Sequence, residues 1–338
     1  REAEVSTPTD LWELLVDEMP VFFADPVDPR IADYVARTAR TVLSPEVLAH
    51  AASAEFALDL TGRLAEIPHR FRNAMRLGLA QEKVRRDRYA GIMHWCIFSS
   101  IVVLTFVTAQ VAIEGDTPIK FLHGTCYLIF SFYGDLFGLI GLIGVGMALN
   151  RRYFQDFHRI RWDERLEDHL IILGLGFVLL TGFFVETARI MVTELVQHPD
   201  WAPWSFVSYV LALGMAQLEL SDGTILGMHI VLWWTHIAGA FAWLALIVFT
   251  RLDHLFFAPV NAFFLRTDSP GRLSKIEDIE QQEVFGVGYV QDFTWKQLFE
   301  LDACVRCGRC TEVCPANISG QPLSPMHLIQ NLSRIQNH

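Results

Sequence analysis

The stretch "HWCIFSSIVVLTFVTAQVAI", residues 94–113, is long and apolar enough for one helical bilayer crossing, which takes about 20 residues. Stretches of similar character follow at residues 121–149, 170–192 and 225–250. A fifth apolar stretch, residues 205–218, has 14 residues, and the charges of the flanks, considered next, decide that it does not cross. The sequence therefore predicts an all-α membrane protein built on a four-transmembrane-helix bundle, with one additional short helix.

The distribution of Lys and Arg predicts which side of the membrane each connection occupies, because these residues accumulate in short cytoplasmic flanks. The flank "RFRNAMRLGLAQEKVRRDR" before the first crossing and "RRYFQDFHRIRWDER" after the second are strongly basic. Residues 193–224 contain neither Lys nor Arg, whereas basic residues return after position 250. We therefore expect a multi-pass protein of the cell (plasma) membrane. Its N- and C-terminal parts are cytosolic, which requires an even number of crossings. Residues 205–218 are then a short outer-face or re-entrant helix rather than a fifth crossing.

Composition excludes some classes of protein. The formal net charge of −11 argues against a nucleic-acid partner. Four of the six cysteines lie in one run near the C-terminus, and Cys96 and Cys126 lie inside apolar stretches, where a thiol is most often a small buried hydrophobe. This distribution argues against a disulfide framework and predicts that the run faces a reducing compartment.

The run "CVRCGRCTEVCP", residues 304–315, has the spacing of bacterial ferredoxins, whose thiolates bind a [4Fe-4S] cluster. A zinc site is the alternative, but it pairs two short hooks across a longer insert, and the sequence shows no second hook. The predicted ligands are Cys304, Cys307, Cys310 and Cys314. In two-cluster ferredoxins the fourth cysteine of such a run serves the other cluster. We therefore expect a second cluster, completed by residues beyond this chain, and a chain that is a piece of a longer, truncated protein.

Histidines within apolar segments are costly in a bilayer and are treated as functional. His236 and His254 are 18 residues apart, five turns of one helix, which separates them by about 27 Å. Two imidazoles from different helices can bind a haem iron from both sides. We predict that His94 and His254 hold an inner haem and that His123 and His236 hold an outer one.

Some of these assignments have alternatives. His229, seven residues before His236, is the rival outer ligand or a quinone contact. Any single histidine of this set could instead be an interfacial side chain that reaches the headgroups.

Other polar positions in the apolar segments are weaker signals. Asp135 lies inside the second stretch, and Glu186 with Arg189 forms an i,i+3 pair near the end of the third. Such a pair can simply neutralise itself. Otherwise these residues, with His229, are candidates for proton exchange with a quinone. Glycines thin the second stretch, which suits close helix packing first and room for a haem plane second; they are Gly134, Gly138, Gly141, Gly144 and Gly146.

The chain is predicted to divide into four parts. Residues 1–88 form a cytosolic or membrane-surface helical region, and residues 89–258 form the transmembrane dihaem domain. Residues 259–299 are a linker, and residues 300–338 begin the ferredoxin-like iron-sulfur segment.

Four segments together carry a resemblance to a known family: "RLGLAQEKVRRDRYAGIMHWCIF", "FLHGTCYLIFSFYGDLFGLIGLIGVGMALNRRYF", "MHIVLWWTHIAGAFAWLALIVF" and the cysteine run. They resemble membrane-bound iron-sulfur oxidoreductases. In these a cytochrome b domain, similar to the gamma subunit of respiratory nitrate reductase, is fused to a domain that resembles heterodisulfide reductase. The resemblance covers roughly residues 76–338, and one branch resembles electron-transfer-flavoprotein:menaquinone oxidoreductase.

The resemblance implies a cytochrome b bundle whose last helix carries two haem ligands, at the spacing of His236 and His254. In the gamma subunit the partner helix also carries two ligands, whereas here Leu104 stands ten residues after His94. His123 from another segment therefore takes the place of the missing ligand. The implied partners are menaquinone or another quinone and a cytosolic electron donor, such as an electron-transfer flavoprotein or an iron-sulfur subunit.

Three functions are compared. The first is a quinone-linked oxidoreductase subunit that transfers electrons across the membrane through a [4Fe-4S] cluster and two b-type haems. The second is a non-catalytic anchor that docks a soluble iron-sulfur or flavoprotein complex and has no reducible haem. A transporter would be expected to show internal repeats, and the sequence has none that we find.

Overall fold

The computed structural model describes residues 66–155, 166–267 and 293–336, together with the single positions 280, 287 and 289. Over these residues the regular structure is helical, as the sequence predicts. Most of the region predicted as surface helices, residues 1–88, lies outside the described ranges. The chain divides into two compact units, of which one is residues 81–253 and the other combines the residues up to Ala80 with those from His254 onward.

Among the described residues, four helices are long and apolar enough to cross a membrane, and they are the four long helices that the sequence predicts. They are α6 (Arg88–Asp116), α7 (Gly124–Tyr153), α9 (Leu166–Val192) and α12 (Asp222–Phe249). In α7 and α9, 33% of the most apolar stretch is buried, against 6% in α6 and α12. Helices α7 and α9 are therefore central, and α6 packs against α7 while α12 packs against α9.

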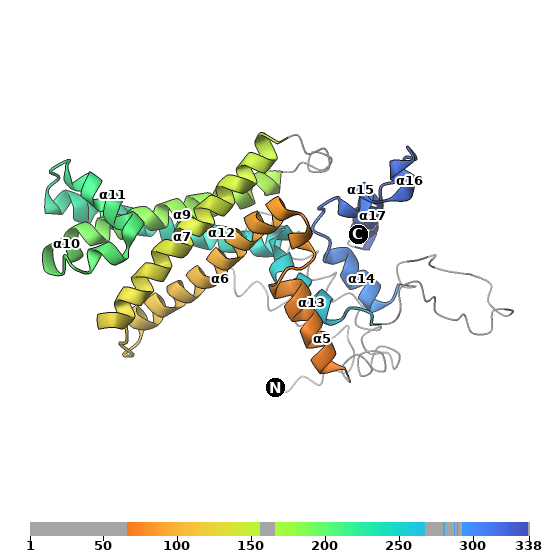
Figure 1. The fold of residues 1–338 in the computed structure, drawn as a ribbon, viewed down its shortest axis with the longest axis horizontal. Helices are drawn as coiled ribbons and strands as arrows, with labels where there is room; N and C mark the ends of the chain where they lie inside the picture. The colour runs from red at the N-terminus through yellow and green to blue at the C-terminus, as the bar shows by residue number, and fades with distance from the viewer. Residues whose placement is uncertain are drawn as a thin grey trace, which may run out of the picture. The chain divides into compact units, whose positions relative to one another are not determined.

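The predicted short helix is present between the third and fourth long helices. Helix α11 (Phe206–Ala216) packs against α9 and α7. It follows α10 (Glu194–Gln197) and the 3-10 turn η4 (Ala202–Trp204). These elements gather at one end of the bundle, called here the α11 end (Figure 1).

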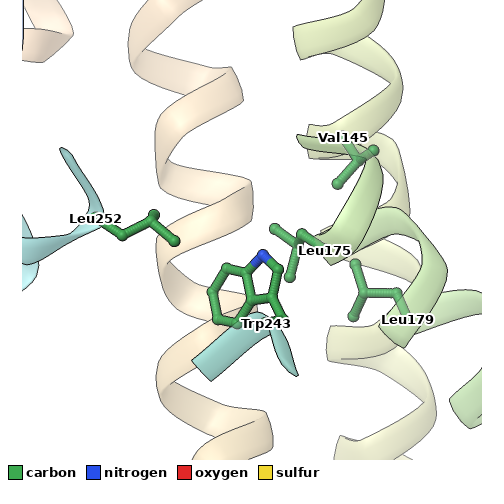
Figure 2. Packing of buried hydrophobic residues seen from close by; sticks show 5 residues of the cluster. All are labelled: Val145, Leu175, Leu179, Trp243 and Leu252. Atoms are coloured by element: carbon green, nitrogen blue, oxygen red, sulfur yellow. The ribbon is translucent and has the colours of Figure 1, made fainter. Parts of the chain in front are cut away.

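The other half of the bundle is held by an apolar core around an indole. Trp243 belongs to one buried cluster with Val145, Leu175, Leu179 and Leu252. Figure 2 shows the indole between Leu252 and Leu175, with Val145 and Leu179 on the far side of Leu175. Its Nε1 donates a hydrogen bond to the Ile171 carbonyl at 3.0 Å. The same side chain thus satisfies its polar atom and fixes α12 against α9.

The glycines of α7 serve helix packing. A Cβ added to Gly138 would lie 2.9 Å from Phe183, and one on Gly144 would lie 2.8 Å from Ile97. Both distances are too short for real side chains, so these glycines let α9 and α6 approach α7 closely. Gly146 has no atom within 4 Å of the added Cβ and makes no such contact.

The second unit is built from shorter helices. Those before the bundle are α5 (Ile67–Ala74) and the π-helical turn η2 (Met75–Leu79); those after it are α13 (His254–Phe263), α14 (Trp295–Asp302), α15 (Arg309–Glu312), α16 (Pro315–Ile318) and α17 (Pro325–Gln336). Helix α5 packs on α13, where Arg70 donates to the Leu265 carbonyl at 2.9 Å. Helix α13 extends into the stretch predicted as a linker, and α14 also lies there.

Candidate cofactor sites

His236 lies in the middle of α12 and is held by the facing helix α9. Its Nδ1 is 3.0 Å from the Thr181 hydroxyl oxygen, and a Cβ on Gly182 would lie 3.3 Å from its ring. Helix α9 therefore offers the imidazole both a polar partner and the space that a larger residue would fill.

The hydrogen bonds of Thr181 assign the tautomer of His236. The Thr181 hydroxyl lies 2.8 Å from the Phe177 carbonyl oxygen, to which it donates its single proton. Its oxygen can then only accept from the imidazole, so Nδ1 of His236 carries the hydrogen and Nε2 carries the lone pair. Metal-ligating histidines are held in this way, with one ring nitrogen donating to a neighbouring oxygen while the other faces the metal.

His123 lies too far along the bundle to pair with His236. A Cβ on Gly182 would contact His236, and one on Gly138 would contact Phe183, so these residues occupy one layer of α7, α9 and α12. His123 is the N-cap of α7 and precedes Gly138 by 15 residues, about 22 Å of helix. The expectation that His123 lies near the depth of His236 is wrong.

His254 does not share a helix with His236. Helix α12 ends at Phe249, Thr250 has extended backbone angles, and η5 (Arg251–Asp253) follows before His254 begins α13. The predicted five-turn spacing on one continuous helix is therefore wrong.

The hydrogen bonds of Thr250 and the ion pairs of Arg251 account for the break. The Thr250 hydroxyl donates to the Leu246 carbonyl at 2.5 Å, and Leu252 N donates to the Thr250 hydroxyl at 3.3 Å. The Arg251 guanidinium forms an ion pair with Asp168 at the start of α9. These contacts turn the chain after α12.

His94 lies in the first two turns of α6 with its Nδ1 3.0 Å from the Gln81 side-chain oxygen. An amide oxygen only accepts, so Nδ1 of His94 is also the protonated nitrogen. Gln81 is 3% exposed and has a positive φ of 53°, so the side chain that contacts His94 is buried. His94 and His254 belong to different compact units, and their pairing stays a prediction.

A cluster of charged side chains occupies the α11 end of the bundle. Arg189 donates to both carboxylate oxygens of Glu186, at 2.7 and 2.9 Å, and to Glu194 at 3.0 Å. The Tyr127 hydroxyl donates to Glu194, and His229 is close enough to Glu186 to interact with it electrostatically. We call these five residues the Arg189 cluster. It contains two carboxylates and one guanidinium.

Asp135 has a structural partner. Its carboxylate accepts from the backbone N–H of Val207 and from the Ser208 hydroxyl at 2.7 Å. Both partners lie in the first turn of α11, where unsatisfied N–H groups favour a carboxylate. Asp135 therefore anchors α11 to α7.

The cysteine run forms a loop whose conformation suits a cluster. Cys304 follows α14, Cys314 caps α16, and both Arg306 and Gly308 have positive φ, at 54° and 73°. Left-handed residues turn backbone N–H groups toward a common concavity, as found at many iron-sulfur sites. Within the described ranges no three His, Cys, Asp or Glu side chains are gathered to hold a metal ion. The assignment of a cluster to this run therefore rests on the loop conformation and on the thiolates as donors.

Sequence reasoning missed four of these polar partners: Gln81, Tyr127, Thr181 and Glu194. Thr181 could have been noticed as a hydroxyl in the middle of an apolar stretch, and Glu194 as the one carboxylate within eight residues after Glu186. Nothing in the sequence indicates that Gln81 reaches His94.

Comparison with known proteins agrees with this arrangement. Residues 90–268 match the family described as "Nitrate reductase gamma subunit", and residues 295–316 match the "4Fe-4S binding domain". The two regions correspond to the helical bundle and to the segment of the cysteine run. No solved structure matches the chain.

Three curated proteins are similar in sequence. "EtfAB:quinone oxidoreductase" of Syntrophomonas wolfei is 36% identical over 264 residues, which is 75% of this chain and 36% of that protein. "Probable iron-sulfur-binding oxidoreductase FadF" of Bacillus subtilis is 32% identical, over 75% of this chain and 35% of that protein. "Probable membrane-anchored ferredoxin" of Chromohalobacter salexigens is 32% identical over 45% of this chain and 21% of that protein. The chain spans about a third of the length of the first two.

Proposed function

Since the chain belongs to the nitrate reductase gamma subunit family and continues into a 4Fe-4S binding domain, we propose that it carries electrons between a cytosolic redox partner and a membrane quinone. The name of the Syntrophomonas relative favours an electron-transfer flavoprotein as the partner. The protein contributes ligands, positions and electrostatics, while bound haem and the cluster supply the one-electron chemistry.

The proposed ligands are the residues whose surroundings fit each group. Cys304, Cys307 and Cys310 would hold one cluster, and Cys314, as in two-cluster ferredoxins, would serve a second. His236 would hold one haem, and His94 with His254 the other. His229 lies two turns from His236 on one helix, so the two imidazoles cannot bind one iron from opposite sides. We therefore assign His229 to the Arg189 cluster, and the position opposite His236 is not assigned.

The observation that carries the proposal is the contact between His236 and Thr181. With Nδ1 hydrogen-bonded to Thr181, the Nε2 lone pair of His236 is available for a metal, as a haem ligand requires. The position of His236 at mid-length in a spanning helix also keeps it from the headgroups, which argues against an interfacial role.

The Arg189 cluster is the proposed site of quinone proton exchange. It has a surplus carboxylate, Glu194, hydrogen-bonded to the Tyr127 hydroxyl, and His229 lies within electrostatic range of Glu186. Glu194 can accept a proton from a quinol and become neutral, while Glu186 stays paired with Arg189, so the three side chains change from one net negative charge to none. Asp135 is left out of this role because its carboxylate is engaged by α11.

An optical spectrum of the purified protein tests the proposal. Reduction by an electron-transfer flavoprotein should produce b-type bands, and adding a menaquinone analogue should reoxidise them. A purified protein without reducible haem would instead indicate a docking anchor.

Thr181→Val is expected to raise the midpoint potential of the haem held by His236. Valine keeps the shape of the side chain but cannot accept the Nδ1 hydrogen, so the imidazole becomes a weaker donor to ferric iron. Loss of such a partner typically lowers affinity for the metal group by about 10–100-fold. Potentiometric titration followed optically measures the shift.

The matched control is Thr105→Val. Thr105 makes the same kind of bond to the carbonyl one turn earlier, Ile101 at 2.7 Å, but contacts no histidine. Equal potentials in wild type and both variants would contradict the assignment of His236.

The proposed orientation places the cysteine run in the cytosol and the α11 end outside. In a Cys126→Ala background, we expect Asp200→Cys to react with an impermeant thiol reagent in intact cells. Gln321→Cys should react only after the membrane is opened, and both side chains are exposed. Labelling of Gln321→Cys from outside would reverse the orientation.

A further inference from the structure

Helices α13 and α14 pack against each other within one compact unit. The ring of Phe257 meets Phe299 edge-on at 5.5 Å between centroids, and Phe264, just after α13, meets Trp295 at 5.3 Å. From Phe257 to Phe264 the residue number rises along α13, whereas the contacted residue on α14 changes from Phe299 back to Trp295. The two helices are therefore antiparallel, and Figure 1 shows them running in opposite directions.

This arrangement brings two proposed cofactor ligands to the same end of the pair. His254 is the first residue of α13, one turn before Phe257. Cys304 follows the end of α14, and its backbone N–H donates to the Leu301 carbonyl at 3.4 Å, which keeps it close to the helix. Continuing the register from Phe257 and Phe299 places His254 beside the residues that lead into Cys304.

A buried charge fixes this register. Lys296 is 5% exposed, and its ammonium donates to Asn261 on α13 at 2.5 Å and to Glu300 at 2.6 Å. A buried ammonium is costly unless its hydrogens are bonded. Sliding α14 by one turn would remove Asn261 from Lys296 and move Cys304 by about 5.4 Å along α13.

We infer that the α13–α14 pair is the point at which electrons pass between the iron-sulfur cluster and the haem held by His254, and that Lys296 is the positioning residue that sets their separation. This rests on the proposed function. In the step, one electron passes from the reduced cluster to the oxidised haem iron, and no bond forms or breaks. Lys296 touches neither group and acts only through the register of the two helices.

The test uses the full-length protein with its cofactors in membranes or nanodiscs. Lys296→Met keeps the length of the side chain but removes the bond to Asn261. We expect its haem and iron contents to equal those of wild type. The rate of haem reduction from the pre-reduced cluster should fall by at least an order of magnitude. The broadening of the cluster electron paramagnetic resonance signal by the nearby ferric haem should weaken in parallel.

Glu300→Gln is the matched control. Glu300 is 49% exposed and is the other partner of Lys296. Glutamine keeps an oxygen that accepts from the Lys296 ammonium, and the bond to Asn261 remains. We therefore expect the loss of charge to lower stability but to leave the register, and with it the rate and the signal, as in wild type. The double variant Lys296→Met/Asn261→Leu replaces both polar groups by apolar ones and tests whether packing alone restores the rate of haem reduction. If this rate stays low, Lys296 sets the register. If the rate returns to that of wild type, Lys296 does not set it.

The outcomes separate the inference from the proposed function. A Lys296→Met protein with full cofactor content and an unchanged rate and signal overturns the inference alone. So does a wild type in which both cofactors are present without magnetic interaction. A wild type that contains no haem overturns the proposed function itself.

Discussion

Replacing His236 with alanine should remove one haem from each polypeptide and abolish electron transfer to quinone. The imidazole is the only side chain for which the structure fixes both a mid-membrane position and a tautomer within the spanning helices that it describes, through Thr181. Alanine supplies no lone pair, and the space beside Gly182 would be left open. The haem held by His254 should still accept electrons from the cytosolic donor.

Haem content per polypeptide and reduction from each side measure this outcome. His198→Ala is the control, because His198 stacks on Trp201 beyond the end of α10 and has no proposed role. The control should keep full haem content and quinone turnover. If the His236→Ala protein retains as much haem as the control, His236 is not a ligand and the electron-transfer proposal for the bundle fails.

The helical bundle was predictable because each crossing is specified by its own composition. A stretch of about 20 apolar residues must form helical hydrogen bonds within itself to cross a bilayer, whatever surrounds it. The charges of the flanks excluded a fifth crossing at residues 205–218, and the structure has a short helix there, α11. The cysteine run was equally local, since its spacing alone predicts the match to a 4Fe-4S binding domain.

The depth of each histidine was not predictable, because it depends on how the helices are shifted against one another. Gly138 and Gly182 set that shift by admitting Phe183 and His236 at close range. Counting from the ends of apolar stretches placed His123 at the level of His236. The packing of α7 on α9 separates them by more than the thickness of one leaflet, about 15 Å.

The end of α12 was not predictable for a related reason. Residues 228–249 continue without a helix breaker into Thr250 and Arg251, and an isolated helix would run on. The turn depends on a tertiary partner, Asp168, which lies more than eighty residues earlier. A pattern of apolar residues contains no information about such a pair.

That pair carries the second large expected effect, on stability. Asp168 is 6% exposed and is shared by Arg152, at 3.1 Å, and by Arg251. Replacing it with asparagine keeps the shape but leaves two guanidinium groups without their common anion. Removing one partner of a buried ion pair costs about 3–5 kcal/mol, and we expect the lower figure because Arg251 is 23% exposed and retains some water.

The melting temperature of Asp168→Asn in nanodiscs should therefore fall well below that of wild type, and amide exchange in residues 250–253 should accelerate. Glu167→Gln is the comparison, because Glu167 lies 3.9 Å from Arg251 and is 21% exposed, a geometry worth about 1 kcal/mol or less. Equal melting of the two variants would show that Asp168 does not hold the turn. A stable Asp168→Asn protein in which exchange at 250–253 is unchanged would mean that the Thr250 hydroxyl alone ends α12. In that case the residues next to the turn, and not the distant Asp168, determine where α13 begins.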